Sequence, residues 1–335
     1  MSRLRLRLAG LSLAVAAALS LSAVRAADVK LLPNDTEIVL TINVQQILQS
    51  DLVKTNKDAL EQLKGLVEQG LQADNQAQKF LKETGFDLFK DLHSLTFAMP
   101  PSKDPEAGFI LIEGNFNVEK VHAVAEAAAK ENGETFKITK AGAHKILEIA
   151  APTGQKVHAC LATKSLMVVA PSDASLKDAL ERLAGTKKSE LKKEFTALLQ
   201  TVNDKQSISF AVTGAAIKKL IEDNPNVPNA EMVAQLMGKV EGLSGAVTIA
   251  KDIQVQLGVG TKDAASAKEF ANSANVALGF VKLMAMQAAK QDEKVQPLAD
   301  AAKSLQATAN GSNLVIRANI SAENLEKLFK NFMPQ

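Results

Sequence analysis

Short turns between consecutive strand patterns constrain this chain more than any other feature. Alternating and branched apolar residues mark the strands, and several neighbouring strands are separated by only two or three turn residues. Such turns lie at residues 141–142, 251–252 and 310–312. Two parallel neighbours would need a crossover of about a dozen residues, so these pairs must be antiparallel. Helical patterns follow many of the strands, and the sequence therefore predicts an α+β protein rather than a doubly wound parallel fold.

Two parts of the chain repeat a similar order of elements. A strand pattern runs into a helix at residues 37–49 and again at residues 207–221. Each part also ends in a strand, a serine cap and an amphipathic helix. We therefore predict an internal repeat of two related halves, each an antiparallel sheet with helices packed on one face. The predicted halves are residues 27–186 and 187–335, and the sequence leaves open whether they share one sheet.

Residues 1–26 have the features of a secretory signal peptide. Three arginines precede an apolar run from Leu8 to Val24, and the small residue Ala26 marks the expected cleavage position. We therefore expect a periplasmic or secreted protein. Cleavage would remove four arginines and no acidic residue, which changes the formal net charge from +2 to −2. A slightly acidic chain that retains two arginines and has no Trp or Tyr is a poor candidate for binding nucleic acid.

The single cysteine, Cys160, limits how the chain is stabilised and anchored. One thiol cannot form an internal disulfide, and Cys160 lies too far from the cleavage position to carry a lipid anchor. The best candidate for a membrane span after the signal peptide, residues 271–289, contains Lys282 and three side-chain amides, which are costly at the centre of a bilayer. We predict a soluble chain with no membrane span after cleavage, stabilised by apolar burial.

The residues with catalytic chemistry do not form a convincing set. His158 and Cys160 share one face of a predicted strand, but no third group is placed to orient the imidazole. Ser189 and Lys192 match a Ser-x-x-Lys pattern without its companion motifs, so Ser189 is interpreted as a helix cap. The remaining histidines, which lack the spacing of zinc ligands, are His93, His122 and His144. We predict no catalytic, metal-binding or cofactor-binding residues and no cofactor.

One helical pattern could serve binding. The segment from Asp263 to Lys290 carries an apolar stripe with methionine and small residues, which adapt well to an apolar ligand or a partner helix. The alternative is that this stripe simply covers the sheet of the second half. The residues assigned to the possible apolar binding face are Phe270, Ala277, Phe280, Val281 and Met284.

Two short segments carry a resemblance to a known group of proteins. Residues 31–43 begin Leu-Leu-Pro-Asn-Asp and continue as a strand, and residues 86–92 read Phe-Asp-Leu-Phe-Lys-Asp-Leu before another strand. In both respects the chain resembles signal-peptide-bearing exported bacterial proteins of unknown function with a Leu-Pro-x-Asp/Asn strand entry. The resemblance covers most of the mature chain. It implies export and an α+β fold, and it carries no catalytic residue.

Strong folding signals without a convergent set of reactive side chains favour a non-enzymatic protein. We expect an exported binding or structural protein of the cell envelope, with an envelope protein or an apolar ligand as its possible partner. The alternative is a hydrolase whose Ser, Asp and Glu residues meet only in the folded chain. A cleft with two or more buried titratable groups would favour the hydrolase. A groove lined by Leu, Phe and Met would favour binding.

Overall fold

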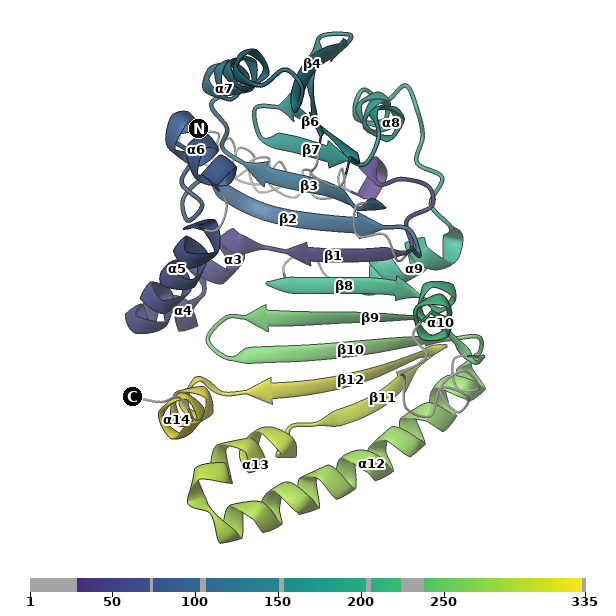
Figure 1. Cartoon of the computed structure of the whole chain (residues 1–335). Helices are drawn as coiled ribbons and strands as arrows, with labels where there is room; N and C mark the ends of the chain where they lie inside the picture. The colour runs from purple at the N-terminus through teal and green to yellow at the C-terminus, as the bar shows by residue number, and fades with distance from the viewer. Residues whose placement is uncertain are drawn as a thin grey trace, which may run out of the picture.

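The strands of this protein form one antiparallel sheet. The computed structural model describes residues 29–72, 75–102, 107–150, 154–202, 206–223 and 238–332, so the predicted signal peptide, residues 1–26, lies outside it. The sheet has 12 strands, and every pair of neighbours with a described register is antiparallel. Figure 1 shows how the strands lie side by side. The predicted α+β class with antiparallel pairing is confirmed.

The order of the strands in the sheet is β11-β12-β10-β9-β8-β1-β2-β3-β7-β6-β5-β4. Their bounds are β1 Ile38–Ile42, β2 Leu92–Met99, β3 Phe109–Gly114, β4 Phe136–Ala141, β5 His144–Ala150, β6 Lys156–Thr163, β7 Leu166–Ala170, β8 Ile208–Thr213, β9 Val240–Ile249, β10 Ile253–Thr261, β11 Gln306–Asn310 and β12 Asn313–Ile320.

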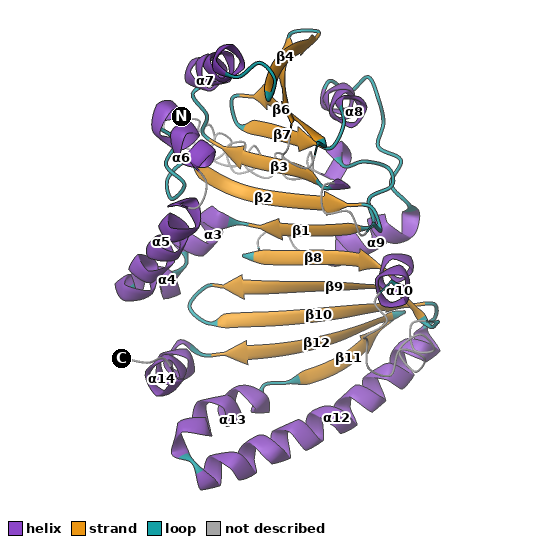
Figure 2. Cartoon of the chain, viewed as in Figure 1, coloured by secondary structure: helices purple, strands orange, loops and turns teal. Residues whose placement is uncertain are grey.

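Most of the helices lie at the two ends of the strands or against the outer strands (Figure 2). Their bounds are α3 Val44–Gln49, α4 Asp51–Thr55, α5 Lys57–Gln72, α6 Asn75–Thr84, α7 Val118–Glu131, α8 Asp173–Leu183, α9 Lys193–Thr201, α10 Gly214–Glu222, α12 Ala264–Gln291, α13 Gln296–Lys303 and α14 Ala322–Phe332. Within the described ranges, no helix has both the length and the apolar character that crossing a bilayer requires.

The two predicted halves meet in the middle of the sheet. Strand β1 pairs with β8, and Leu40 lies opposite Phe210 at the centre of this pairing. From that junction outward, each half places its first three strands in chain order and then its last strand, β7 or β12, beside the third. The hairpin β4–β5 extends the first half by two further strands. The halves therefore share one continuous sheet, and their origin by duplication stays a prediction.

One face of the sheet, here called the packed face, carries the main core. Along β3 and β7 the inward residues Phe109, Leu111 and Val168 are each 1% exposed. They pack with Leu176 of α8 and Phe195 of α9, both of which are fully buried. We call the opposite side the open face. Because α6 and α7 lie over the open face, the first half carries helices on both faces instead of the single covered face that the sequence suggested.

Helix α9 approaches the sheet closely because of a glycine. A side chain at Gly242 of β9 would lie 2.2 Å from Cδ1 of Leu198 and 2.7 Å from the carbonyl oxygen of Val212. Leu198 fills the space above this glycine and is 5% exposed. The missing side chain thus lets α9 close the packed face over the strands next to the junction.

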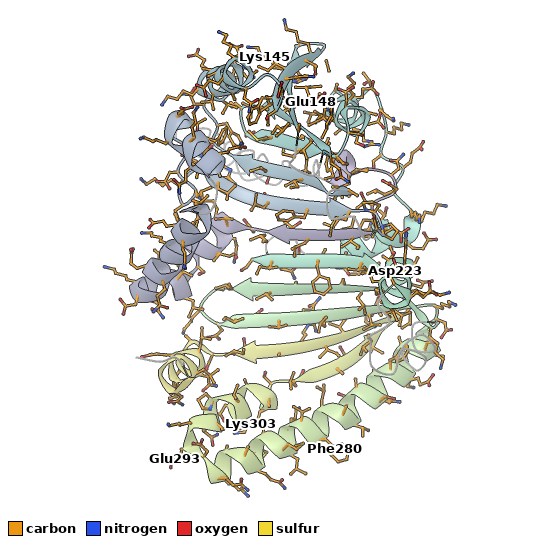
Figure 3. The ribbon with its side chains drawn as sticks, in the orientation of Figure 1. Lys145, Glu148, Asp223, Phe280, Glu293 and Lys303 are labelled. Atoms are coloured by element: carbon orange, nitrogen blue, oxygen red, sulfur yellow. The ribbon has the colours of Figure 1, made fainter. Side chains whose placement is uncertain are left out.

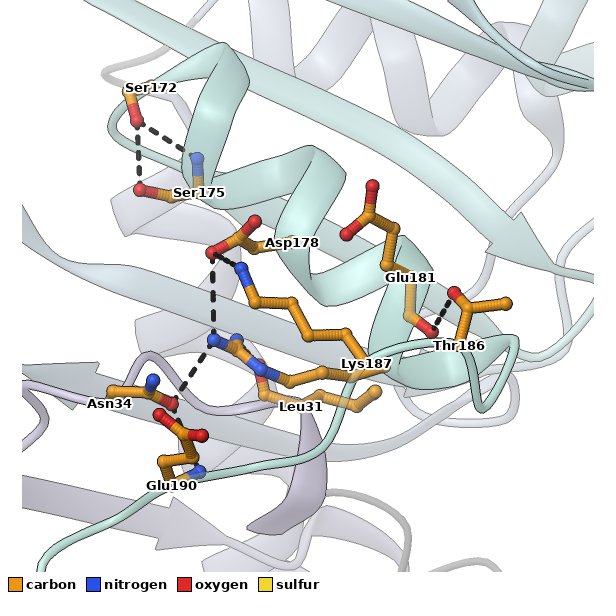
Figure 4. A network of polar contacts seen from close by, with 10 residues as sticks. Leu31, Asn34, Ser172, Ser175, Asp178, Glu181, Thr186, Lys187 and Glu190 are labelled. Atoms are coloured by element: carbon orange, nitrogen blue, oxygen red, sulfur yellow. Dashed lines mark hydrogen bonds and ion pairs between the residues drawn. The ribbon is translucent and has the colours of Figure 1, made fainter.

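The first described residues are held by a buried arginine. Arg182 of α8 donates hydrogen bonds to the carbonyl oxygen of Leu31, at 3.4 Å, and to Oδ1 of Asn34, at 3.2 Å (Figure 4). Its guanidinium also lies 3.7 Å from a carboxylate oxygen of Asp178. These contacts place Leu31 and Leu32, each 1% exposed, in the core of the packed face.

Candidate functional site

An apolar cavity lies on the open face of the first half. It has a volume of about 530 Å³, within the range of roughly 300–1,000 Å³ that is usual for small-molecule sites. Strands β4 to β7 form its floor, and helices α6 and α7 form its roof. The site is thus built from segments between residues 76 and 169, all in the first half.

The alternation of side chains along the strands determines which residues form the floor of the cavity. Successive side chains of a strand point to opposite faces, so the residues between the core positions of β5, β6 and β7 face the cavity. Apart from Lys145, which lies on the same side of β5, the residues of these strands that face the cavity are apolar. They are Leu147, Ile149, Ala159, Leu161, Met167 and Val169.

The roof is made of small and medium-sized side chains. Helix α7 begins after Asn117, whose side chain accepts a hydrogen bond from the backbone N–H of Lys120, and turns one apolar stripe toward the sheet. Two residues of this stripe are alanines, whose side chains are too short to fill the space between α7 and the strands. Leucines at the same positions would fill it. The roof residues are Ala77, Phe80, Val121, Val124, Ala125 and Ala128.

The charged residues that line the cavity, Lys79, Glu83, Glu131 and Lys145, are all at least partly exposed to solvent. Lys79 of α6 forms an ion pair with Glu131 of α7, with an Nζ–Oε2 distance of 2.6 Å. Lys145 of β5 pairs with Glu126 of α7, with an Nζ–Oε1 distance of 2.7 Å. Glu131 raises the pKa of Lys79, mainly through its hydrogen bond, and the hydrogen bond from Lys145 lowers the pKa of Glu126. The two pairs tie α7 to α6 and to the sheet.

This arrangement suits an apolar or amphiphilic ligand. The lining is mostly apolar, and its polar members belong to α6, to α7 and the residue after it, and to β5. They are Gln76, Lys79, Glu83, His122, Glu131, Asn132 and Lys145. Over the apolar floor, a polar group in the middle of a ligand would lack a partner, at a cost of roughly 1–3 kcal/mol. The geometry therefore favours a molecule whose polar part, if it has one, lies at one end.

The helix that the sequence singled out lies at the other end of the open face. Phe270 is half-buried and packs with Leu314 and Ala307 beneath α12. The other four predicted residues, Ala277, Phe280, Val281 and Met284, are exposed. The alternative prediction, that this stripe covers the sheet, therefore holds for Phe270 and Ala274 of the stripe but not for these four exposed residues. Further alanines of α12 face the strands beside Ala274. They include Ala267 and Ala271.

The candidate pair His158 and Cys160 belongs to the packed face. Cys160 is 2% exposed, and burial raises its pKa to about 11. Although Cys160 borders the cavity, its side chain is part of the main core. His158 lies 3.6 Å from Glu148, measured from Nε2 to Oε2. A thiol of such high pKa is protonated at neutral pH, so this pair does not form an activated nucleophile.

Buried acidic residues serve the fold. Glu37 accepts hydrogen bonds from Lys192 and from Oγ1 of Thr213, and these ties join β1 to β8 and α9. Burial acts to raise the pKa of Glu37, but the bonds from Lys192 and Thr213 outweigh it and hold the pKa below its ordinary value. Glu113 accepts a hydrogen bond from Ser94 on the neighbouring strand.

These buried acids are separate from the cavity, and the described residues contain no group of three or more His, Cys, Asp or Glu side chains that could hold a metal ion. Lys192 of the Ser-x-x-Lys match pairs with Glu37 rather than with Ser189. The described chain therefore brings together none of the reactive pairs that the sequence raised.

Comparisons with known proteins add little. No family model matches the chain, and no curated protein matches it. Among solved structures, crystal form I of TP0453 matches with a TM-score of 0.41 and 13% sequence identity. The match covers 88% of this chain and 93% of that one.

The sequence analysis missed the cavity because its parts are far apart in the chain. One signal was present: helix α7 combines valines with Ala125 and Ala128 on the stripe that faces a bulky strand floor. Small residues on a helix that covers large ones either allow close packing or leave space. Only the distance between α7 and the sheet, which the structure supplies, decides between the two.

Proposed function

We propose that this protein is an exported binding protein that holds an apolar or amphiphilic small molecule in the cavity beneath α6 and α7. The observation that carries the proposal is the combination of a volume of about 530 Å³ with a floor of apolar side chains. Removing apolar ligand surface from water yields roughly 25 cal/mol for each Å². The cavity therefore binds through the hydrophobic effect and selects its ligand by shape.

The dimensions of the floor favour an elongated ligand. The distance from β4 to β7 covers three strand spacings, or about 14 Å. A hydrocarbon chain laid across these strands would contact Ile138 at one side and Val169 at the other. Its polar end would then lie at the rim, near Lys79 or Lys145. A single-chain amphiphile fits this arrangement better than a compact polar molecule.

Export is the second part of the proposal. It rests on the signal-peptide pattern of residues 1–26 and on the resemblance to exported bacterial proteins through residues 31–43 and 86–92. N-terminal sequencing of the protein purified from an envelope fraction should find Ala27 as the first residue. An N-terminus that still carries residues 1–26 in a cytoplasmic fraction would contradict this part of the proposal.

The binding experiment uses the mature chain and a fluorescent long-chain fatty acid as the probe. We expect saturable binding at one site for each chain. The substitution Ala128→Leu fills the cavity and should weaken binding by at least about tenfold, because the added side chain occupies the volume that the probe needs. Ala123→Leu on the exposed side of α7 is the matched control and should bind as the wild type does. Equal affinity in all three proteins would refute this site.

The alternative of a hydrolase has no supporting observation in the described residues. The buried pairs Glu37–Lys192 and Ser94–Glu113 connect structural elements and do not border the cavity. A separate assay with an ester of the same fatty acid tests this alternative, because hydrolysis would release free fatty acid and an alcohol with time.

A further inference from the structure

The outer side of α12 exposes more large apolar side chains than any other described element. Figure 3 labels Phe280 on this helix, below the sheet. Phe280 is 65% exposed, Met284 is 68% exposed and Val276 is 64% exposed. Leu283 and Val281 are also about half exposed. Monomeric proteins rarely leave such a contiguous apolar surface in water without an interaction that covers it.

The exposed residues follow the spacing of a helix that packs against another helix. Positions 269, 273, 276, 280, 283, 287 and 290 alternate in steps of four and three, which is the a/d spacing of a coiled-coil seam. The apolar members lie in the centre, from Val276 to Leu283, and polar residues lie at both ends. We call these positions, together with Ala277 and Met284, the outer stripe of α12.

The outer stripe is complementary to itself in side-chain size. When two copies of α12 pack antiparallel about a twofold axis at Phe280, residues at equal distances from Phe280 face each other. Val276 then faces Met284, and the small Ala277 faces Leu283. Ser273 faces Gln287 beyond them, so polar groups meet polar groups.

The stripe is also complementary to itself in charge. Glu269 lies eleven residues before Phe280 and Lys290 lies ten residues after it, so the same axis brings each glutamate next to the lysine of the other copy. Glu269 already pairs with Lys239 of its own chain at 2.9 Å, and both side chains of that pair remain at least half exposed. A parallel arrangement would instead place like charges together at each end.

We propose that the outer stripe of α12 is a self-association surface and that its occupant is α12 of a second copy of this chain, packed antiparallel about Phe280. The other side of α12 is fixed on β10, β11 and β12, so the helix presents this stripe as a rigid surface. The proposal is independent of ligand binding in the first half.

The first test is the oligomeric state of the mature chain, measured by sedimentation from about 1 µM to about 500 µM. We expect a reversible dimer. Phe280→Glu places two carboxylates at the axis and should weaken dimerisation by at least about a hundredfold. The control Leu220→Glu changes a side chain on α10 that is 45% exposed and should leave the dimer unchanged. A wild-type chain that stays monomeric at the highest concentration would overturn the proposal.

The second test distinguishes a second copy from a lipid surface. Glu269→Lys should weaken the dimer several-fold, and the double variant Glu269→Lys/Lys290→Glu should restore it, although the bond to Lys239 stays broken. A bilayer offers no reciprocal charge and would show no such restoration. Binding of monomers to anionic vesicles that is lost in Phe280→Glu, without restoration in the double variant, would refute the second copy as the occupant.

A crosslinking variant covers the case in which Phe280→Glu fails to fold. Ser273→Cys/Gln287→Cys places two thiols opposite each other across the axis, and the native Cys160 is buried and does not compete. Oxidation should give covalent dimers. Absence of covalent dimers at concentrations at which the wild type dimerises would overturn the proposal.

Discussion

Helices α7 and α12 occupy equivalent places in the two halves but use their apolar side chains in opposite ways. Each helix follows the third strand of its half, and each lies over the open face of the sheet. Helix α7 contacts β4 and turns its apolar stripe toward the strands, and a cavity remains between them. Helix α12 lies on the strands through alanines and leaves a second apolar stripe in water.

The comparison shows that side-chain size alone does not set the role of a helix on a sheet, because the distance between the helix and the strands matters as well. Under α12, Ala267 and Ala271 allow contact with the strands, and both are at most 5% exposed. Under α7, alanines face the sheet too, but ion pairs at Lys79 and Lys145 join the helix to its surroundings at the rim. The same residue type therefore gives tight packing in one place and a ligand-sized space in the other.

The largest expected difference between the α12 region and the α7 region is in the stability lost when a large apolar side chain of the sheet is replaced by alanine. Leu314 lies beneath α12 and is 4% exposed, so Leu314→Ala should lower the free energy of unfolding by about 2–5 kcal/mol. Leu161 on the cavity floor already borders empty space and is only half-buried. Leu161→Ala should cost less than about 2 kcal/mol, because part of its contacts are missing in the wild type.

Urea unfolding of both variants, followed by circular dichroism, measures this difference. Equal losses of stability in Leu314→Ala and Leu161→Ala would mean that α7 packs as tightly as α12. In that case the cavity would be closed in solution.

Neighbouring residues on β6 should differ strongly in thiol reactivity. Burial raises the pKa of Cys160 from about 9 to about 11, so its thiolate at pH 8 is about a hundredfold scarcer than that of an ordinary thiol. Ala159→Cys, made together with Cys160→Ala, places a thiol on the cavity floor instead. Iodoacetamide should alkylate this variant faster, and the fatty-acid probe should protect it, while labelling of Cys160 should not respond to the probe.

The raised pKa of Cys160 also gives a stability effect with a definite sign. The folded chain holds the thiol proton more tightly than the unfolded chain does. The free energy of unfolding is therefore unaffected by this thiol below about pH 9, and it falls as the pH rises toward about 11. Wild type should therefore lose stability relative to Cys160→Ala over that range. A constant difference in unfolding midpoint between pH 8 and pH 11 would contradict the buried position of the thiol.

Much of the fold follows from local sequence signals, whereas the site does not. The cap at Asn117 and the turn at Gly142, where φ is +58°, depend on a few adjacent residues and were predictable. The pairing of β1 with β8 depends on strands about 170 residues apart, and no local pattern specifies it.

The cavity was missed for a similar physical reason. Amphipathic spacing identifies an apolar stripe on a helix but does not say which side meets the sheet. Helix α12 has two such stripes, one of alanines and one around Phe280, and the larger side chains attracted the prediction. The cavity beneath α7 depends on a distance between elements, which periodicity does not contain.

A pair of small-to-large substitutions sharpens the contrast between the helices. Ala271→Leu under α12 introduces a side chain where no space exists, and should destabilise the fold by about 1–3 kcal/mol. Ala128→Leu under α7 fills part of the cavity and should leave stability unchanged or raise it by about 1 kcal/mol. Thermal unfolding without ligand compares the two variants. Destabilisation of both to the same extent would mean that α7 has no more free space beneath it than α12 has.

The smallest expected effect concerns the ion pairs that hold α7. Because the pKa of Glu126 is lowered in the folded chain, its pair with Lys145 stabilises the fold at pH values above the ordinary carboxylate pKa. This stabilisation is lost as the pH falls through the pKa of Glu126 in the folded chain. The raised pKa of Lys79 means that its pair with Glu131 is lost only as the pH rises through the ammonium range. Both pairs are therefore complete at neutral pH. Because both are exposed to solvent, salt should weaken them.

Glu126→Gln/Glu131→Gln removes both pairs and should speed release of the fatty-acid probe by less than about threefold at low salt, with no difference at high salt. Stopped-flow dilution measures the release rate. Glu323→Gln on α14 breaks an equivalent exposed pair with Lys327, far along the chain from the cavity, and should release the probe at the wild-type rate. An unchanged rate in the double variant at low salt would show that apolar contacts alone, with Val121 as the buried residue of α7, keep the helix in place. Helices α7 and α12 would then differ in how closely they pack on the sheet, but apolar contacts would hold both of them in place.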